Sequence, residues 1–112
     1  MPLSRDTEEA LRAFVAARDW DQFHTPENLA KSIAIEASEL LECYQWGENR
    51  SQSPKQREHI EDELADVVTY CVHLANRLGV DLDEIVMRKL AKTERRYPIE
   101  SNQGEINKRA AP

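Results

Sequence analysis

The 112-residue chain lacks any long hydrophobic run, and this absence excludes an ordinary membrane-spanning helix. No apolar stretch approaches the roughly 18 residues that such a helix needs. The amino-terminal sequence MPLSRDTEEA is acidic and has no apolar segment of the kind found in secretory signal peptides. We therefore expect a cytoplasmic protein that has no membrane partner.

The chain also lacks an excess of basic residues. It has 15 Lys and Arg against 21 Asp and Glu, which gives a net charge of −6. Sequence-independent binding to nucleic acid needs a basic face, so nucleic acid is excluded as a partner. An acidic chain is better suited to binding anionic ligands through a metal cation.

Cysteine and histidine are scarce, and they do not cluster. Cys43 and Cys71 lie within helical patterns without metal-type spacing, so we predict reduced thiols in the core. None of the three histidines has a glutamate three residues before it. The Glu-x-x-His signature of carboxylate-bridged di-iron bundles is therefore absent.

The first helix start signal is the segment Asp6-Thr7-Glu8-Glu9, which resembles a capping box. Apolar residues at helical spacing follow it, and the pattern fades near Asp19. We expect the segment from Trp20 to His24, which is aromatic and polar by turns, to be a loop.

Three further helices are predicted over residues 25–47, 53–79 and 81–97. The first two open with Thr25-Pro26 and Ser53-Pro54, each a capping residue followed by proline at the first helical position. A glycine is expected to end each of these two helices, at positions 47 and 79.

Four helices with short connections indicate an all-α four-helix bundle. We predict one helical domain over residues 1–98 and a polar tail or arm over residues 99–112. Ile35 and Val72 extend apolar surface beyond what one small bundle is expected to cover. A homo-oligomer is therefore predicted, at least a dimer, with a tetramer of two tight dimers preferred.

Carboxylates occur where a plain bundle would place apolar residues. At about 100° per residue, Glu36 falls inside the apolar stripe of the 25–47 helix and Glu39 lies on its edge. On the 53–79 helix, Glu63 borders the apolar face and Asp66 belongs to a polar strip beside it. Residues three apart share a side of a helix, so an antiparallel pair of these helices could bring all four carboxylates together.

Four carboxylates without His or Cys form an all-oxygen site, which suits Mg²⁺, or Mn²⁺ as a substitute, and not zinc. A carboxylate within a core stripe is costly unless it is paired or binds a cation. The alternative to a metal is a structural salt bridge from Glu36 to Lys89 or Arg77.

Basic and aromatic residues near the helix ends add to the pattern. Lys89 and Thr93 fall on the inward side of the fourth helix, where a lysine could take up charge from a polyphosphate. Several aromatic side chains are equally consistent with core packing and with a stacking pocket for a base. They are Trp20, Phe23, His24 and Trp46.

Together these residues resemble the MazG-like nucleotide pyrophosphohydrolases, and within that family the dCTP-pyrophosphatase branch. The resemblance covers about residues 8–98. It rests on Arg18-Asp19-Trp20-Asp21-Gln22-Phe23-His24, Pro26, Asn28-Leu29, Glu36-x-x-Glu39-Leu40, Trp46, Glu63-Leu64-Ala65-Asp66-Val67, Tyr70 and Arg96-Tyr97-Pro98.

The resemblance implies an all-α NTP pyrophosphatase fold. It also implies a house-cleaning enzyme that converts a (d)NTP to (d)NMP and pyrophosphate, with dCTP or a related dNTP as the expected substrate. It implies Mg²⁺ held by Glu36, Glu39, Glu63 and Asp66. Glu36 or Glu39 is the candidate base for the attacking water. It further implies nucleoside contacts from Trp20, His24, Trp46 and Tyr70, and phosphate contacts from Lys89 and Arg96.

One position departs from the family pattern. Members of the family often carry Asn where this chain has Thr93, whose shorter reach would alter a substrate contact. A hypothesis of another class is a non-catalytic helical interaction module whose acidic face binds a partner. Release of pyrophosphate from dNTPs separates the two hypotheses.

Overall fold

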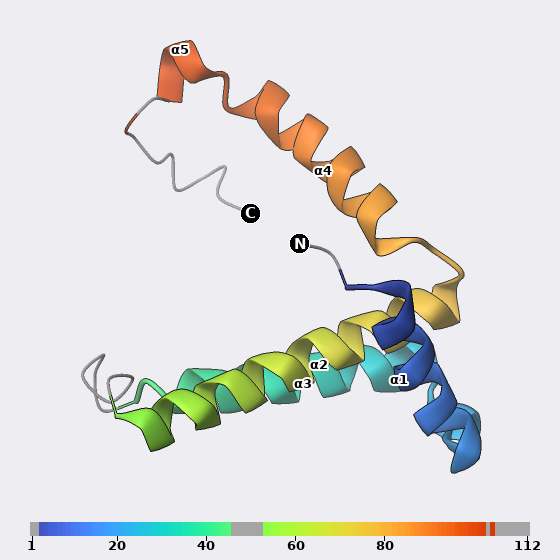
Figure 1. Ribbon diagram of the computed structural model, residues 1–112. Helices are drawn as coiled ribbons and strands as arrows, with labels where there is room; N and C mark the ends of the chain where they lie inside the picture. Colours follow the sequence, from blue (N-terminus) through green and yellow to red (C-terminus); the bar gives the residue numbers. More distant parts are fainter. Residues whose placement is uncertain (1–2, 46–52, 103, 105–112) are drawn as a thin grey trace. The chain divides into compact units, whose positions relative to one another are not determined.

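The computed structural model describes residues 3–45, 53–102 and Gly104, and the regular structure among them is entirely helical (Figure 1). The all-α class predicted from the sequence is confirmed. In chain order the elements are α1 (Arg5–Ala17), the 3₁₀ helix η1 (Trp20–Phe23), α2 (Pro26–Glu42), α3 (Pro54–Leu78), α4 (Leu82–Arg96) and α5 (Ile99–Asn102). No helix in the described part of the chain is long and apolar enough to cross a bilayer.

The starts of α2 and α3 follow from local capping, as predicted, and α4 begins in the same way. The side chains of Thr25, Ser53 and Asp81 each accept a hydrogen bond from the backbone N–H three residues further on, at 3.1, 3.1 and 3.2 Å. These bonds satisfy amides that have no partner inside the helix. Gly79, with φ of 69°, ends α3 in the left-handed conformation that glycine adopts without steric cost.

Several predicted boundaries were wrong by a few residues. Helix α1 begins at Arg5, because the hydroxyl of Ser4 caps the N–H of Thr7 at 3.1 Å, ahead of the acidic residues. The predicted loop over residues 20–24 contains the 3₁₀ helix η1. Helix α2 ends at Glu42 with a turn over residues 43–45, and Gly47 lies outside the described residues. The predicted tail includes the short helix α5.

Asp19 joins α1 to η1 in the left-handed region, with φ of 56° and ψ of 37°. It is the one non-glycine residue with positive φ among those described. The amide of Gln22 donates to the Asp19 carbonyl at 3.0 Å and to its carboxylate at 3.3 Å. Asp is among the few side chains that tolerate this conformation.

Helices α2 and α3 lie side by side and antiparallel, and α1 packs against α3 (Figure 1). The buried apolar side chains come from all three helices and the turn after α2: Val15, Leu29, Cys43, Ile60, Val72 and Ala75. Both thiols are free. Cys43 is buried in the core as predicted, whereas Cys71 is only half-buried.

The two residues on which oligomerisation was predicted differ in exposure. Ile35 is 58% exposed, as expected for a residue opposite the core stripe. Val72 was wrongly predicted to lie on an uncovered face, because its side chain is 0% exposed within this chain.

The chain divides into two compact units, Met1–Val80 and Asp81–Pro112, and each is described by itself. Helices α1, η1, α2 and α3 belong to the first unit, and α4 and α5 belong to the second. The domain boundary predicted at residue 98 stays a prediction.

Candidate functional site

The antiparallel pair of α2 and α3 brings three of the four predicted carboxylates together. Glu36, Glu39 and Glu63 each offer an oxygen atom within 4.8 Å of the others. Asp66 is not part of this close group, yet its charge raises the pKa of both Glu36 and Glu63. The four carboxylates therefore interact electrostatically, with three of them in direct reach of one ion.

Two oxygens of this carboxylate cluster are buried without a partner. Among the described residues, Oε2 of Glu36 and Oε2 of Glu63 lack any hydrogen bond. A buried carboxylate oxygen without a donor or a cation is costly. The residues present therefore fit a hard divalent cation, which would satisfy both oxygens.

Burial and crowding raise the affinity of the carboxylate cluster for protons. Burial, a hydrogen bond with Glu39 and the charges of Glu39, Asp66 and Glu63 raise the pKa of Glu36 from 4.5 to about 7. Burial likewise raises the pKa of Glu63, together with a hydrogen bond and charge from Glu39 and the charge of Asp66, against the opposing charge of His59. A divalent cation would remove this repulsion.

We expect Glu36 to make the cation-free protein less stable as the pH rises from about 5 to about 7.5. Its folded-state pKa is raised from 4.5 to about 7, so the folded state binds the proton more tightly. The stabilisation is fully present below about pH 4.5 and is lost as the pH rises through about 7. In EDTA, the thermal midpoint of the wild type should fall by several degrees over this range.

The matched variants are Glu36→Gln, which cannot ionise, and Glu58→Gln, an exposed position on α3. The first should flatten much of the pH dependence of the midpoint, and the second should leave it unchanged. A wild-type midpoint that stays level or rises over this range would contradict the assignment.

The salt-bridge alternative for Glu36 does not form with Arg77. In the described part of the chain the ion pairs join Lys31 to Glu27, Arg57 to Glu61 and His59 to Glu63. Arg77 instead lines a cavity near the carboxyl end of α3. Lys89, the other alternative partner, belongs to the second unit.

Two neighbours of the carboxylate cluster were missed in the sequence. His59 lies one turn before Glu63 on α3, with Nδ1 4.0 Å from Oε1 of Glu63. The thiol of Cys43 donates to the Glu39 carbonyl at 3.5 Å, and burial followed by the charges of Glu63 and Glu42 raises its pKa. Their spacing of four residues from a predicted ligand was the signal that could have identified them.

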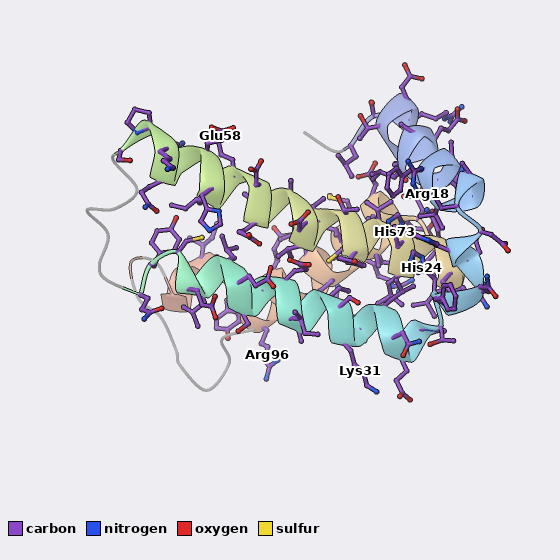
Figure 2. All side chains as sticks on the ribbon, turned by 90° about the horizontal axis from the view of Figure 1, so that it is seen from below. Arg18, His24, Lys31, Glu58, His73 and Arg96 are labelled. Atoms are coloured by element: carbon purple, nitrogen blue, oxygen red, sulfur yellow. The ribbon has the colours of Figure 1, made fainter. Side chains whose placement is uncertain are left out.

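The predicted nucleoside residues are only partly gathered. His24 and Tyr70 both contact His73, with ring centroids 5.1 and 5.9 Å apart, and Figure 2 shows the two imidazoles close together. Trp20 packs edge-on against Phe14 with centroids 5.5 Å apart. Trp46 lies outside the described residues.

The predicted phosphate contacts lie together on α4. The Lys89 ammonium donates to Oγ1 of Thr93 at 3.4 Å, and this hydroxyl donates to the Lys89 carbonyl at 3.0 Å. Arg96 is exposed in the last turn of the helix. Their relation to the carboxylate cluster stays a prediction.

A cavity of about 230 Å³ opens where α1 and η1 meet the carboxyl end of α3. Its walls are mostly polar or charged. They are formed by Arg12, Val15, Asp21, His24, His73, Asn76 and Arg77.

Comparison with known proteins decides the family. Residues 31–109 match the sequence model of the MazG-like family. The chain belongs to the MazG-like family. This MazG-like match contains all four candidate carboxylates and all of α3, and it begins after η1 and His24.

Curated relatives of this MazG-like chain include dCTP pyrophosphatase 1 from two mammals. The Bos taurus protein is 37% identical over 112 residues, covering 96% of this chain and 66% of that protein. The Homo sapiens protein is 42% identical over 102 residues, covering 87% of this chain and 60% of that protein. The chain thus spans 60 to 66% of the length of these relatives.

A solved structure shares the fold. The crystal structure of a pyrophosphatase from Archaeoglobus fulgidus matches with a TM-score of 0.77 and 36% sequence identity. The match covers 88% of this chain and 97% of that one. The all-α fold expected from the MazG-like resemblance is therefore confirmed.

Proposed function

We propose that this MazG-like chain hydrolyses a nucleoside triphosphate to the monophosphate and pyrophosphate, with dCTP or a related dNTP as substrate. The observation that carries this proposal is the carboxylate cluster on α2 and α3, with its two buried, unpartnered oxygens. The relatives named dCTP pyrophosphatase support the choice of substrate. We also propose that the protein is cytoplasmic and removes unwanted nucleotides from the nucleotide pool.

Glu36, Glu39, Glu63 and Asp66 are proposed to hold Mg²⁺, with Mn²⁺ as a substitute. All of their donor atoms are carboxylate oxygens, which these hard cations prefer. When bound, such a cation would neutralise charge on the phosphates and lower the pKa of a bound water.

The hydrolytic step needs a base beside the attacking water. The water oxygen forms a bond to the α- or β-phosphorus while the bond between that phosphorus and the bridging α–β oxygen breaks. The electron pair stays with the departing phosphate group. The proton passes to a carboxylate oxygen of Glu36 or Glu39. The closeness of these two side chains, whose oxygens lie within 4.8 Å of each other, supports their cooperation as base and orienting group.

The remaining candidate residues are proposed to hold the substrate. Their supporting observations are the convergence of His24 and Tyr70 on His73 and the pairing of Lys89 with Thr93. The nucleoside group comprises Trp20, His24, Trp46 and Tyr70, and the phosphate group comprises Lys89 and Arg96. Thr93 is proposed as a further substrate contact.

The purified protein is expected to release pyrophosphate from dNTPs when Mg²⁺ is present, and a coupled assay for pyrophosphate measures it. The non-catalytic interaction module predicts no release from any of the four dNTPs. A rate equal to the protein-free background with every nucleotide would contradict the proposed activity.

We also propose a homo-oligomer, at least a dimer and preferably a tetramer. With Val72 buried, the support comes from aliphatic side chains exposed on α2 and α3, namely Ile35 at 58%, Leu41 at 72% and Leu64 at 51%. Exposed aliphatic groups on helix faces are commonly buried between subunits. Sedimentation at low micromolar concentration should show a species of at least twice the chain mass; a single species near 12.9 kDa would contradict it.

A further inference from the structure

A polar strip runs along α3 from the carboxylate cluster to the cavity. Successive spacings of three and four residues place its members on one side of the helix. They are Glu63, Asp66, Tyr70, His73 and Arg77. The first two belong to the proposed cation site, and the last two line the cavity.

The length of this strip matches one extended ligand. Glu63 and His73 are ten residues apart on a continuous helix. At about 1.5 Å per residue, their backbones are therefore about 15 Å apart. A nucleotide whose phosphates lie at the carboxylate cluster can extend along the strip and place its base in the cavity.

The cavity suits a small polar ring. Its volume of about 230 Å³ is below the roughly 300–1,000 Å³ typical of pockets that hold drug-sized ligands whole. Guanidinium, amide, carboxylate and imidazole groups supply both donors and acceptors around it. A nucleobase with donors and acceptors on its edge fits this wall better than a bulky or apolar ligand.

His73 is the buried polar residue in this wall. It is 9% exposed, and its ring contacts His24 and Tyr70. Burial and the charge of His24 lower the pKa of His73, against the opposing charge of Asp21. The imidazole is therefore neutral near pH 7, with one donor nitrogen and one acceptor nitrogen.

We propose that His73 hydrogen-bonds to the edge of the substrate base in this cavity, which makes it a specificity-determining residue. This inference rests on the proposed function, because it places the base relative to phosphates at the carboxylate cluster. The His24 ring packs against the His73 imidazole, with centroids 5.1 Å apart, and helps to hold it in place.

The kinetic test compares His73→Phe with His73→Gln on dCTP, dTTP, dATP and dGTP. Phenylalanine keeps a ring against His24 and Tyr70 but removes both nitrogens, whereas glutamine keeps a donor and an acceptor. His73→Phe should lower kcat/KM for the preferred pyrimidine nucleotide by at least about tenfold, mainly by raising KM. The differences in kcat/KM among the four nucleotides should become smaller. His73→Gln should retain more of the preference.

Two further measurements separate a lost base contact from a damaged fold. Binding of tripolyphosphate, which has no base, should be unchanged in His73→Phe, and its melting curve should stay cooperative. An equal loss for all four nucleotides, or unchanged selectivity, in a folded His73→Phe variant would overturn the proposal.

A binding experiment keeps this proposal distinguishable from the hydrolytic one. The imidazole resonances of His73, assigned by their loss in His73→Gln, should shift when the wild type is titrated with dCMP in EDTA. If dCMP shifts other resonances and leaves those of His73 in place, the proposed base site is wrong. If His73 responds but no dNTP yields pyrophosphate, the base site stands and the hydrolytic function fails.

Discussion

Replacing Glu36 with glutamine is expected to lower pyrophosphate release by at least about 100-fold while the protein stays folded. Loss of groups that only hydrogen-bond to metal ligands already costs about 10- to 100-fold, and Glu36 is proposed to be a ligand. The carboxyl group also carries the raised pKa of about 7, so its removal relieves repulsion within the cation-free cluster. Turnover at saturating Mg²⁺ and thermal melting in EDTA measure the two effects, and the cation-free variant should melt above the wild type near pH 7.5.

Asp66→Asn tests the carboxylate that lies outside the close group. A comparable loss of turnover is expected, because the charge of Asp66 acts on both Glu36 and Glu63. The matched control is Glu58→Gln, since Glu58 is exposed on the same helix and points away from α2 (Figure 2). Near-normal turnover in either Glu36→Gln or Asp66→Asn would show that the proposed cation site is wrong.

Removal of divalent cations is expected to reduce pyrophosphate release to the protein-free background. Among the described residues of the first unit, no lysine or arginine pairs with the carboxylate cluster, and only the His59 imidazole lies beside it, 4.0 Å from Glu63. Without a divalent cation, the cluster would therefore repel a triphosphate. Dialysis against EDTA followed by addition of Mg²⁺ or Mn²⁺ should restore the rate in proportion to occupancy.

Thermal melting supplies a readout that does not depend on turnover. A cation that binds only the folded state stabilises it by about 2.7 kcal/mol at 100 times its dissociation constant. The midpoint should therefore rise with Mg²⁺ in the wild type, and much less in Glu36→Gln. Hydrolysis that continues unchanged in excess EDTA would refute the cation requirement.

Features set by neighbouring residues in the sequence could be predicted. The caps at Thr25, Ser53 and Asp81 depend on an oxygen reaching an amide three residues away, so the sequence alone identifies them. The pairing of carboxylates on each helix likewise follows from helical spacing. Their convergence depends on α2 and α3 packing antiparallel, which a short connection favours.

Features set by distant residues could not be predicted in this way. Val72 is buried by neighbours that the periodicity of α3 does not reveal. The guanidinium of Arg12 donates to the amide of Asn76 at 3.3 Å, across 64 positions of sequence. His73 fits the polar strip by spacing, but its burial becomes apparent only once Asp21 and His24 are placed near it. Contacts of this kind can be identified only when the packing of the helices is known.

The left-handed backbone conformation of Asp19 restricts which amino acids can replace it in the course of evolution. Glycine and asparagine adopt φ near 56° with little strain, whereas valine and isoleucine would have to distort the turn. Asp21 and His24, which line the cavity, follow this turn directly. A substitution that distorts the turn at position 19 would therefore displace Asp21 and His24 and reshape the cavity wall without touching it.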